Sequence, residues 1–327
     1  MPEYDAALLL HTRTVTAWDC LCRGQCRGKA GEEWSPTTLI SFPQHGVYVH
    51  SVGQRDVVAD VNHVVVINED EPYQVSHPVP GGDATLTIGV NPATLVEIIP
   101  QQYRHGTERA ALTVSGLRID AATQHMASAL RQRLSRGTID GLEAESAALR
   151  LIRHTLGDTS AHQARFGHGN LERMADDVKL LLATNPWRRW TLAELGAEIG
   201  VTPVYLTDAF RRVEGMPLYR YQLRMRLALA LSLLADCTDL TTLAIDLGFT
   251  SHSHFTATFR RTYGLTPSAY QRSLGIRRAH DHASLTVDGR RPGYPSRSLV
   301  PVDVVSPARR PDVGRTPSCV PSAARAC

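Results

Sequence analysis

The sequence lacks a run of about 18 apolar residues, and its first residues, Met1 to Asp5, lack the basic start of a secretion signal. Both absences argue against a membrane span and against export. We therefore expect a soluble, cytoplasmic protein without a membrane partner. The six cysteines have neither zinc-finger nor paired-disulfide spacing, so reduced thiols are expected in that compartment.

A strong excess of positive charge is also missing. The formal net charge is +3 over 327 residues. It divides into −4 for residues 1–170, +2 for residues 171–275 and +5 for residues 276–327. If this chain binds nucleic acid, the placement of its arginines must supply the attraction, because the overall charge is too small.

The length favours two folded domains, and composition divides the chain further. Residues 157–170 are polar and punctuated by glycine, which is typical of a linker. Residues 276–327 are rich in Pro, Arg and Ser without an apolar period, and they predict a disordered tail. The expected folded domains are residues 1–156 and 171–275.

The first domain has a β pattern up to about residue 100. Short β-branched runs are separated by Pro, Gly and Asn, which is typical of a barrel or a sandwich. The expected strands are residues 37–42, 46–52, 57–61, 64–67 and 84–90. Two amphipathic helices follow, at 120–136 and 142–156. They either cover the open end of the β domain or form a dimer contact, and the sequence leaves both readings open.

The second domain contains a segment that nearly repeats itself at an offset of 49 residues. Residues 206–215 match residues 255–264 in core aromatics, in an arginine pair and in a closing glycine. The matched residues are Thr207 and Thr256, Phe210 and Phe259, Arg211–Arg212 and Arg260–Arg261, and Gly215 and Gly264. Each copy follows a short apolar helix and a turn, so the pattern predicts two helix-turn-helix units.

Capping residues set the expected helix boundaries in the first unit. Thr191 and Glu194 form a capping box, and Gly200 ends the helix that they begin. Thr202 caps the second helix, with Pro203 at its first position. The outward positions of that second helix are Val204, Thr207, Asp208 and Arg211.

The second unit has the same order of signals. Asp239 caps its first helix, Gly248 makes the turn, and Thr250 or Ser251 caps its second helix. Phe255 and Phe259 are spaced to face inward. The outward positions are His252, Ser253, Thr256, Ala257 and Arg260.

A run of good helix formers without Gly or Pro, residues 218–235, connects the two units. Eighteen residues give roughly 27 Å of helix, which suits two recognition helices about one DNA turn, ~34 Å, apart. Arg211, Arg212, Arg260 and Arg261 suit phosphates, and short hydroxyls and His suit base edges. A plain helical bundle explains the apolar spacing but not the doubled arginine pair.

Residues 187–273 resemble the DNA-binding region of AraC/XylS-type transcription regulators. The stretches that carry the resemblance are residues 192–217, 224–234 and 243–270, the last with the order Gly-Phe, Phe, Phe-Arg-Arg, Gly, Pro, Tyr. The base-reading positions that it implies are Val204, Thr207, Asp208, His252, Ser253, Thr256 and Ala257. Asp208 is a departure, because a carboxylate repels phosphate unless it accepts from a cytosine or pairs with a neighbouring arginine.

The resemblance also implies an α+β two-domain fold. The N-terminal domain would be a cupin-like β-barrel or jelly roll with two flanking helices, used for effector binding and dimerisation. The C-terminal domain would be all-α, with its two units joined by a long helix. The implied function is a ligand-responsive activator without catalysis or cofactor. Its partners would be double-stranded DNA, a small-molecule effector, RNA polymerase and a second copy of the chain.

Two alternatives rest on the N-terminal domain. Cys20, Cys22 and Cys26 lie within seven residues, beside arginines, so they could sense a soft metal or the redox state. The competing reading is that Cys20 and Cys22 share one strand face as ordinary small side chains. A cupin-type enzyme with a helical accessory module is more remote, because the four histidines between residues 45 and 77 include no His-x-His pair and show no metal-site spacing.

Overall fold

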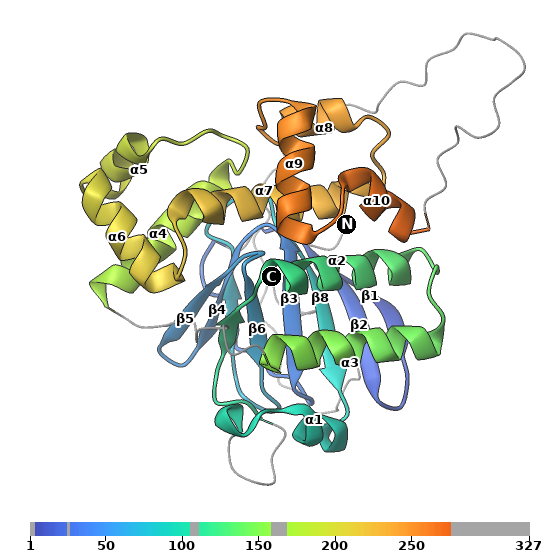
Figure 1. Cartoon of the computed structure of the whole chain (residues 1–327). Helices are drawn as coiled ribbons and strands as arrows, with labels where there is room; N and C mark the ends of the chain where they lie inside the picture. The colour runs from blue at the N-terminus through green and yellow to red at the C-terminus, as the bar shows by residue number, and fades with distance from the viewer. Residues whose placement is uncertain (1–3, 25–26, 105–110, 158–168, 276–327) are drawn as a thin grey trace, which may run out of the picture. The chain divides into compact units, whose positions relative to one another are not determined.

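The computed structural model describes residues 4–24, 27–104, 111–157 and 169–275 (Figure 1). Cys26, residues 158–168 of the expected linker and the whole 276–327 tail lie outside these ranges. The described residues all belong to one compact unit. Within them, no helix is long and apolar enough to cross a membrane.

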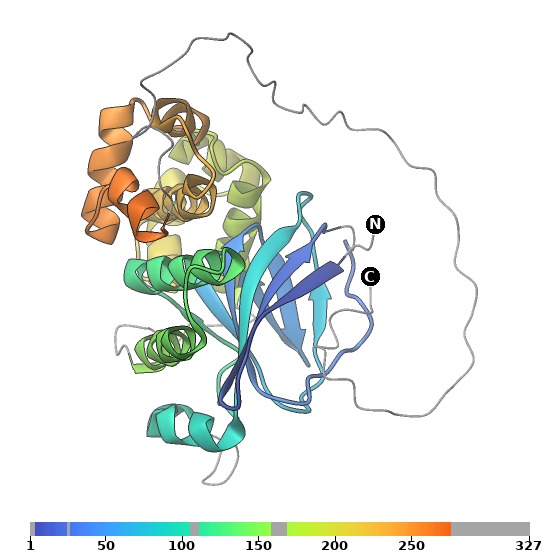
Figure 2. The same ribbon diagram turned by 90° about the vertical axis from the view of Figure 1, so that its right-hand side faces the viewer.

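The N-terminal part is built from two antiparallel sheets (Figures 1 and 2). The larger sheet has the order β1-β2-β8-β3-β6-β9, and the smaller one has the order β5-β4-β7. The strands are β1 (Tyr4–His11), β2 (Val15–Cys22), β3 (Leu39–His45), β4 (Tyr48–Val52), β5 (Arg55–Ala59), β6 (His63–Ile67), β7 (Gln74–Ser76), β8 (Asp83–Val90) and β9 (Gly116–Arg118). No ladder joins the two sheets among the described residues, so the expected closed barrel is not confirmed.

Alternation along β8 explains why all eight of its residues are buried. Leu86 and Ile88 belong to the main apolar core, whereas Thr85 and Thr87 line a cavity on the opposite face of the sheet. Side chains alternate between faces with a period of two, so a strand covered on both sides buries every residue. The sheet therefore separates an apolar layer from a cavity.

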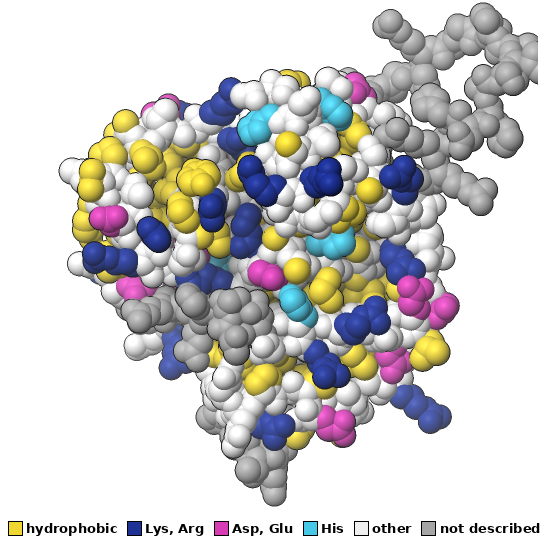
Figure 3. Space-filling model, viewed as in Figure 1, with side chains coloured by type: hydrophobic (Ala, Val, Ile, Leu, Met, Phe, Trp, Pro, Cys, Tyr) yellow, Lys and Arg dark blue, Asp and Glu magenta, His cyan; other side chains and the backbone are white. Residues whose placement is uncertain are grey.

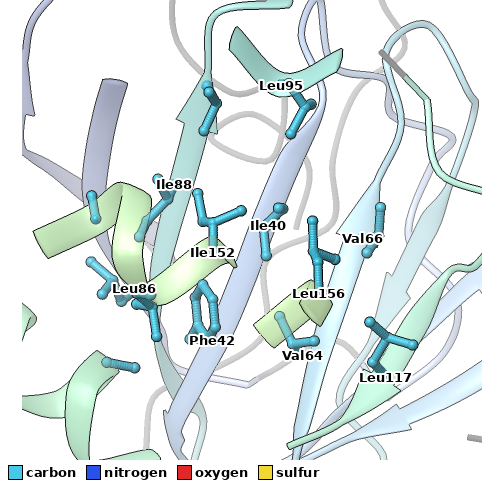
Figure 4. Packing of buried hydrophobic residues seen from close by; sticks show 14 of the residues in the cluster. Ile40, Phe42, Val64, Val66, Leu86, Ile88, Leu95, Leu117, Ile152 and Leu156 are labelled. Atoms are coloured by element: carbon cyan, nitrogen blue, oxygen red, sulfur yellow. The ribbon is translucent and has the colours of Figure 1, made fainter. Parts of the chain in front are cut away.

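Two helices, α2 (Ala121–Ser135) and α3 (Gly141–Gly157), confirm the two expected amphipathic segments. Ile152 and Leu156 of α3 pack with Phe42, Leu86 and Ile88 of the larger sheet (Figure 4). Both helices thus cover one face of that sheet, instead of the open end of a barrel. Burial of these side chains contributes roughly 1.5–3 kcal/mol each to folding.

Several features of this part were not expected, among them the three-residue strands β7 and β9. Strand β1 was missed because it lacks β-branched residues, and β2 was expected only as the strand that Cys20 and Cys22 would share in one of the alternative readings. Asn91 and Pro92 were expected in a turn. Instead, the Asn91 side chain caps a helix, α1 (Pro92–Ile98), with Pro92 at its start. A short 3-10 helix, η1, follows at Gln101–Tyr103.

The C-terminal part is all helical. Its helices are α4 (Asn170–Thr184), α5 (Leu192–Ile199), α6 (Pro203–Glu214), α7 (Leu218–Leu234), α8 (Leu240–Asp246), α9 (His252–Tyr263) and α10 (Pro267–Ser273). One apolar core forms around α4, α5, α6 and the first half of α7, with Leu206 and Phe210 fully buried. A second core forms around the other half of α7 and α8 to α10, with Phe255 and Phe259 fully buried.

Candidate nucleic-acid interface and effector cavity

The first helix-turn-helix unit consists of α5 and α6, and local signals position both helices. Thr191 and Glu194 form a reciprocal capping box at the start of α5. Gly200, with φ of 77°, ends the helix in the left-handed region that favours glycine. The Thr202 side chain accepts from the Tyr205 N–H at the start of α6, as expected. The caps therefore fix where α6 begins and which face it exposes.

The second unit, α8 and α9, repeats this arrangement. The Asp239 side chain caps α8, and Ser251, the second of the two expected candidates, caps α9. Gly248 makes the turn with φ of 78°. A Cβ at this position would lie 2.4 Å from the Trp187 carbonyl oxygen. Close packing as well as backbone conformation thus requires glycine in this turn.

Helix α7 carries both units. Leu218 and Tyr221 at its start pack in the first core, whereas Leu231 and Leu234 at its end pack in the second. The 17 residues of α7 span about 25 Å. Each unit is therefore fixed to one end of the same rigid element.

The expected DNA-reading side chains all lie on α6 and α9 and none is buried. Val204 is 75% exposed. Asp208, Ser253 and Ala257 are exposed, and Thr207, His252 and Thr256 are half-buried. The phosphate candidates Arg211, Arg212, Arg260 and Arg261 are all exposed. Figure 3 shows Lys and Arg side chains exposed over α9 and beside α6.

Hydrogen bonds restrict what some of these side chains can offer. The Thr207 hydroxyl donates to the Pro203 carbonyl at 2.8 Å, so its proton is already used within α6. His252 Nε2 and Thr256 Oγ1 lie 3.4 Å apart, one turn along α9. Asp208 forms no ion pair with Arg211 or Arg212 in the described part of the chain. Its carboxylate is thus exposed on the outer face of α6.

Tyr205 is a candidate that sequence reasoning missed. It lies at the start of α6 beside Val204 and is 48% exposed. In the sequence, Tyr205 stands next to Leu206 of the apolar face, so it resembles a core residue. The structure shows that its side chain is exposed. Its ring and hydroxyl add a contact surface next to the expected reading positions.

The C-terminal end of α6 is anchored in a buried charge network, which the sequence did not predict. Lys179 of α4 lies 3.1 Å from Glu214, the last residue of α6, and 2.7 Å from Asp176. Burial alone would lower the pKa of Lys179, but these two carboxylates raise it above its ordinary value. Lys179 and Glu214 are therefore both charged at neutral pH, although their side chains are only 3% exposed.

The network continues into the β part. His63 of β6 lies 3.4 Å from Glu214 and 3.0 Å from Asp60. The Tyr221 hydroxyl of α7 donates to the other oxygen of Asp60 at 2.5 Å. Burial would raise the pKa of Asp60, but His63 and Tyr221 hold it below its usual value. The first reading helix is thus tied to the sheet through groups from four elements.

Backbone carbonyls strengthen this connection. The Arg118 guanidinium of β9 donates to the Val213 carbonyl at the end of α6. Arg224 of α7 donates to the Ile119 carbonyl at 2.6 Å. A cation near a helix C-terminus also complements the helix dipole. A displacement of β6 or β9 would therefore act directly on α6.

Between the two sheets lies an open-mouthed cavity of about 90 Å³. This volume is below the 300–1,000 Å³ typical of small-ligand pockets, so a molecule bound there would extend through the open mouth. Its walls are mainly apolar and aromatic, with a few polar groups. The lining residues with a thiol, a ring or a charged group include Cys20, Cys22, Tyr48, His50, Tyr73, His77 and Asp83.

The structure describes two of the three thiols of the expected cluster. Cys20 and Cys22 share one face of β2 and both line the cavity, whereas Cys26 lies outside the described residues. Burial raises the pKa of the Cys20 thiol, which lies 3.7 Å from the Thr87 hydroxyl. Cys22 instead lies beside His77 and Asp83, which the sequence reasoning did not connect with it because they are more than 50 residues away.

His50 lies in the wall of the cavity, and its burial predicts how the stability of the protein depends on pH. It is 1% exposed, neither ring nitrogen has a hydrogen-bond partner, and burial lowers its pKa from 6.5 to about 4. Between these two values the unfolded chain binds a proton that the folded chain does not. The free energy of unfolding should fall as the pH drops through this window, by up to ~3 kcal/mol from this group.

The variant His50→Leu should remove that contribution. We expect urea denaturation at pH 4.5 and at pH 7 to give a smaller stability difference for His50→Leu than for the unchanged chain. The remaining titratable side chains are the same in both proteins, so their contributions cancel in the comparison. An identical pH dependence in the two proteins would mean that His50 is not held neutral.

Two helix-turn-helix units on one shared helix, each with an exposed second helix, are the arrangement of a helix-turn-helix DNA-binding domain. Residues 195–273 match the family model described as a helix-turn-helix domain. Together with the residue pattern of α5 to α10, this match identifies the region as an AraC/XylS-type DNA-binding domain.

The similar proteins are transcription regulators. The regulatory protein PocR of Salmonella typhimurium is 29% identical over 84 residues, which are 25% of this chain and 28% of PocR. The transcriptional activator RhrA of Rhizobium meliloti is 39% identical over 75 residues, 22% of this chain and 24% of RhrA. The chain spans only 24–36% of the length of the curated relatives it matches.

Solved structures also resemble the chain. ToxT of Vibrio cholerae with a bound unsaturated fatty acid is 13% identical and aligns with 82% of this chain and 98% of its own. The TM-score is 0.32. This likeness is too low for any detail of ToxT to be transferred to this chain.

Proposed function

We propose that the chain is a sequence-specific transcription activator that places α6 and α9 in two successive major grooves. The observation that carries this proposal is the exposure of the matched reading positions and arginine pairs, while the matched phenylalanines are buried. Val204, Thr207, Asp208, His252, Ser253, Thr256 and Ala257 would contact base edges. Arg211, Arg212, Arg260 and Arg261 would bind phosphates.

The β part would act as the effector domain, as in a cupin-like regulator. Its cavity lies between the two sheets, is open to solvent, and has the mainly apolar wall with a few polar groups that is typical of a small-molecule site. A ligand there would contact strands of both sheets, and β6 contributes both to the cavity, through Ile67, and to the network, through His63. Strand β6 therefore offers a path from the ligand to α6. RNA polymerase and a second copy of the chain would be the protein partners of an activator of this kind.

Selection from a random duplex library, followed by footprinting of the selected DNA, tests the proposal. We expect protection over two successive major grooves on one side of the duplex, whose centres lie about 10 base pairs apart. The full chain should be used, because α2 packs against α7 and α9. Protection of a single groove would contradict the two-unit reading.

Single substitutions separate the proposed roles. Arg260→Ala should weaken binding to all sequences and reduce the salt slope by about 1, as the loss of one phosphate contact does. Thr256→Ala should instead change the preferred base at one position. Arg150→Ala on α3 is the matched control. That arginine is exposed, and helix α2 lies between α3 and α9 (Figure 1). Equal effects of Arg260→Ala and Thr256→Ala would show that the roles are assigned wrongly.

A further inference from the structure

One wall of the cavity holds a thiol, an imidazole and a carboxylate in a row. Cys22 Sγ lies 4.0 Å from His77 Nδ1, and His77 Nε2 lies 2.7 Å from Asp83 Oδ1. The Thr85 hydroxyl donates to the other oxygen of Asp83 at 3.1 Å. Each ring nitrogen therefore faces one partner, and the carboxylate is itself held in place.

The backbone brings these groups together. Cys22 is the direct ladder partner of Asp83 at the ends of β2 and β8. Just before β8, Gly82 has φ of 68°, and a Cβ there would lie 2.0 Å from the Cys22 carbonyl oxygen. Only glycine permits this approach. The close contact fixes the thiol beside the carboxylate and beside His77, which follows β7.

The same three side chains have ligand atoms within 4.8 Å of one another, the range of a metal site. A metal ion, however, binds one ring nitrogen of a histidine. The sulfur and the carboxylate would therefore have to lie on the side of that same nitrogen. Here the sulfur and the carboxylate face opposite nitrogens of the ring, and the carboxylate is already hydrogen-bonded to its nitrogen. This geometry is that of a proton relay, in which a carboxylate orients an imidazole that activates a nucleophile.

Electrostatics agree with the geometry. Burial would lower the pKa of His77, but Asp83 and Cys22 raise it to about 10. The thiolate is the reactive form of cysteine, and the His77 nitrogen that faces the sulfur is placed to carry the thiol proton. Cys20, two residues away on the same strand face, lacks such a partner, and burial keeps it a thiol.

The thiol lines a cavity that is open to solvent, so a reactant can approach it. Leu39, Ile67 and Val75 give it apolar walls, and the buried His50, without a hydrogen-bond partner, offers a polar contact inside. The rings of His50 and Tyr73 are tilted by 32°, with centroids 5.1 Å apart, on the wall formed by the smaller sheet and its neighbouring loop. The site thus suits a molecule with an apolar body and one polar, thiol-reactive group.

We propose that Cys22 is a covalent modification site for α,β-unsaturated carbonyl compounds, with His77 as proton carrier and Asp83 as the residue that positions His77. The sulfur bonds to the β-carbon, the carbon–carbon π bond breaks, and its electron pair moves toward the carbonyl oxygen. The thiol proton, carried by His77, is delivered to the α-carbon. Nothing is oxidised and no other reactant is needed. As an effector reaction, this step rests on the proposed regulatory function.

The test uses the purified full chain and trans-2-nonenal as the probe, with adducts located by peptide mass spectrometry. Cys237, on the helical part, serves as the reference thiol within the same molecule. General acid–base assistance typically contributes 10²–10⁴-fold, so Cys22 should react at least ~100-fold faster than Cys237. His77→Gln should remove this advantage and leave the rate at Cys237 unchanged.

Asp83→Asn, which keeps the shape of the side chain, addresses the positioning role. It should lower the maximal rate of adduct formation at Cys22 by about tenfold or more, while the half-saturating concentration of nonenal stays the same. A merely structural role would change the half-saturating concentration or the folding of the protein. Glu97→Gln on α1 is the matched carboxylate-to-amide control, because Glu97 is exposed and does not line the cavity, and it should keep the fast maximal rate.

Two outcomes would overturn the proposal. One is a rate at Cys22 that does not exceed that at Cys237, or that survives His77→Gln. The other is tight binding of one Zn²⁺ that shields Cys22, with no adduct from nonenal, which would make the cluster a metal site. Both readouts are independent of DNA. If the adduct forms selectively but the untreated chain binds no duplex, the proposed regulatory function fails and the modification site stands.

Discussion

Lys179→Met is expected to lower the free energy of unfolding by about 3–5 kcal/mol, because it leaves the buried Glu214 and the half-buried Asp176 without their cation. Methionine fills a similar volume, so the loss reports the charge rather than a cavity. Glu214 and Asp176 lie within 3.1 Å and 2.7 Å of the lysine nitrogen. Urea denaturation at pH 7 measures the change. Because Glu214 ends α6, DNA binding should weaken in the same variant.

The other lysine of the sequence provides the control. Lys29 pairs with Asp56 at 2.9 Å, but both side chains are 44% exposed. Exposed ion pairs contribute about 0–1 kcal/mol, so Lys29→Met should have little effect. Lys179→Met combined with Glu214→Gln should recover part of the loss, because one of the unpaired charges is then removed. Similar losses of unfolding free energy in Lys179→Met and Lys29→Met would mean that the pair of Lys179 and Glu214 contributes no more than an exposed ion pair.

Phe259→Ala is expected to destabilise the second unit by about 3–5 kcal/mol. The ring is fully buried and contacts three other aromatic rings, with centroid distances of 5.7 Å to Phe255, 4.8 Å to Tyr263 and 6.1 Å to Tyr270. Removal of the ring leaves a cavity under α9, so the reading face loses its support. The free energy of unfolding, measured by urea denaturation, and the affinity for a DNA duplex should therefore fall together.

Ile245→Ala on α8 is the matched control for this core variant. Ile245 is 54% exposed and lies in the same unit, so its loss should change stability by no more than about 0.5 kcal/mol. If Phe259→Ala left duplex affinity unchanged despite the loss of stability, α9 would not be a recognition helix.

The helix-turn-helix units could be read from the sequence because their signals are local. Thr191, Thr202, Asp239 and Ser251 cap their helices as expected, and each signal acts within one helical turn. The inward position of Phe210 and Phe259 follows from helical spacing alone. The same locality explains why the two helices after the β region were also found.

The β part was read less completely. Strand signals in β1 and β2 are weak, and the pairing of β2 with β8 joins residues about 70 positions apart. No local pattern reports which strands become neighbours, so neither the two separate sheets nor the cavity between them could be derived. Sequence reasoning noticed Cys22 for its neighbouring cysteines, whereas its structural partners are His77 and Asp83.

The sequence by itself thus determined the twin units, the long helix between them and the outward faces of α6 and α9, because caps and apolar spacing act over a few residues. Only the tertiary structure decided that Lys179, Glu214, His63 and Asp60 share one buried network, and that Cys22, His77 and Asp83 meet at one wall. Charges and thiols become reactive or stabilising through neighbours that chain folding supplies, and those neighbours are distant in the sequence.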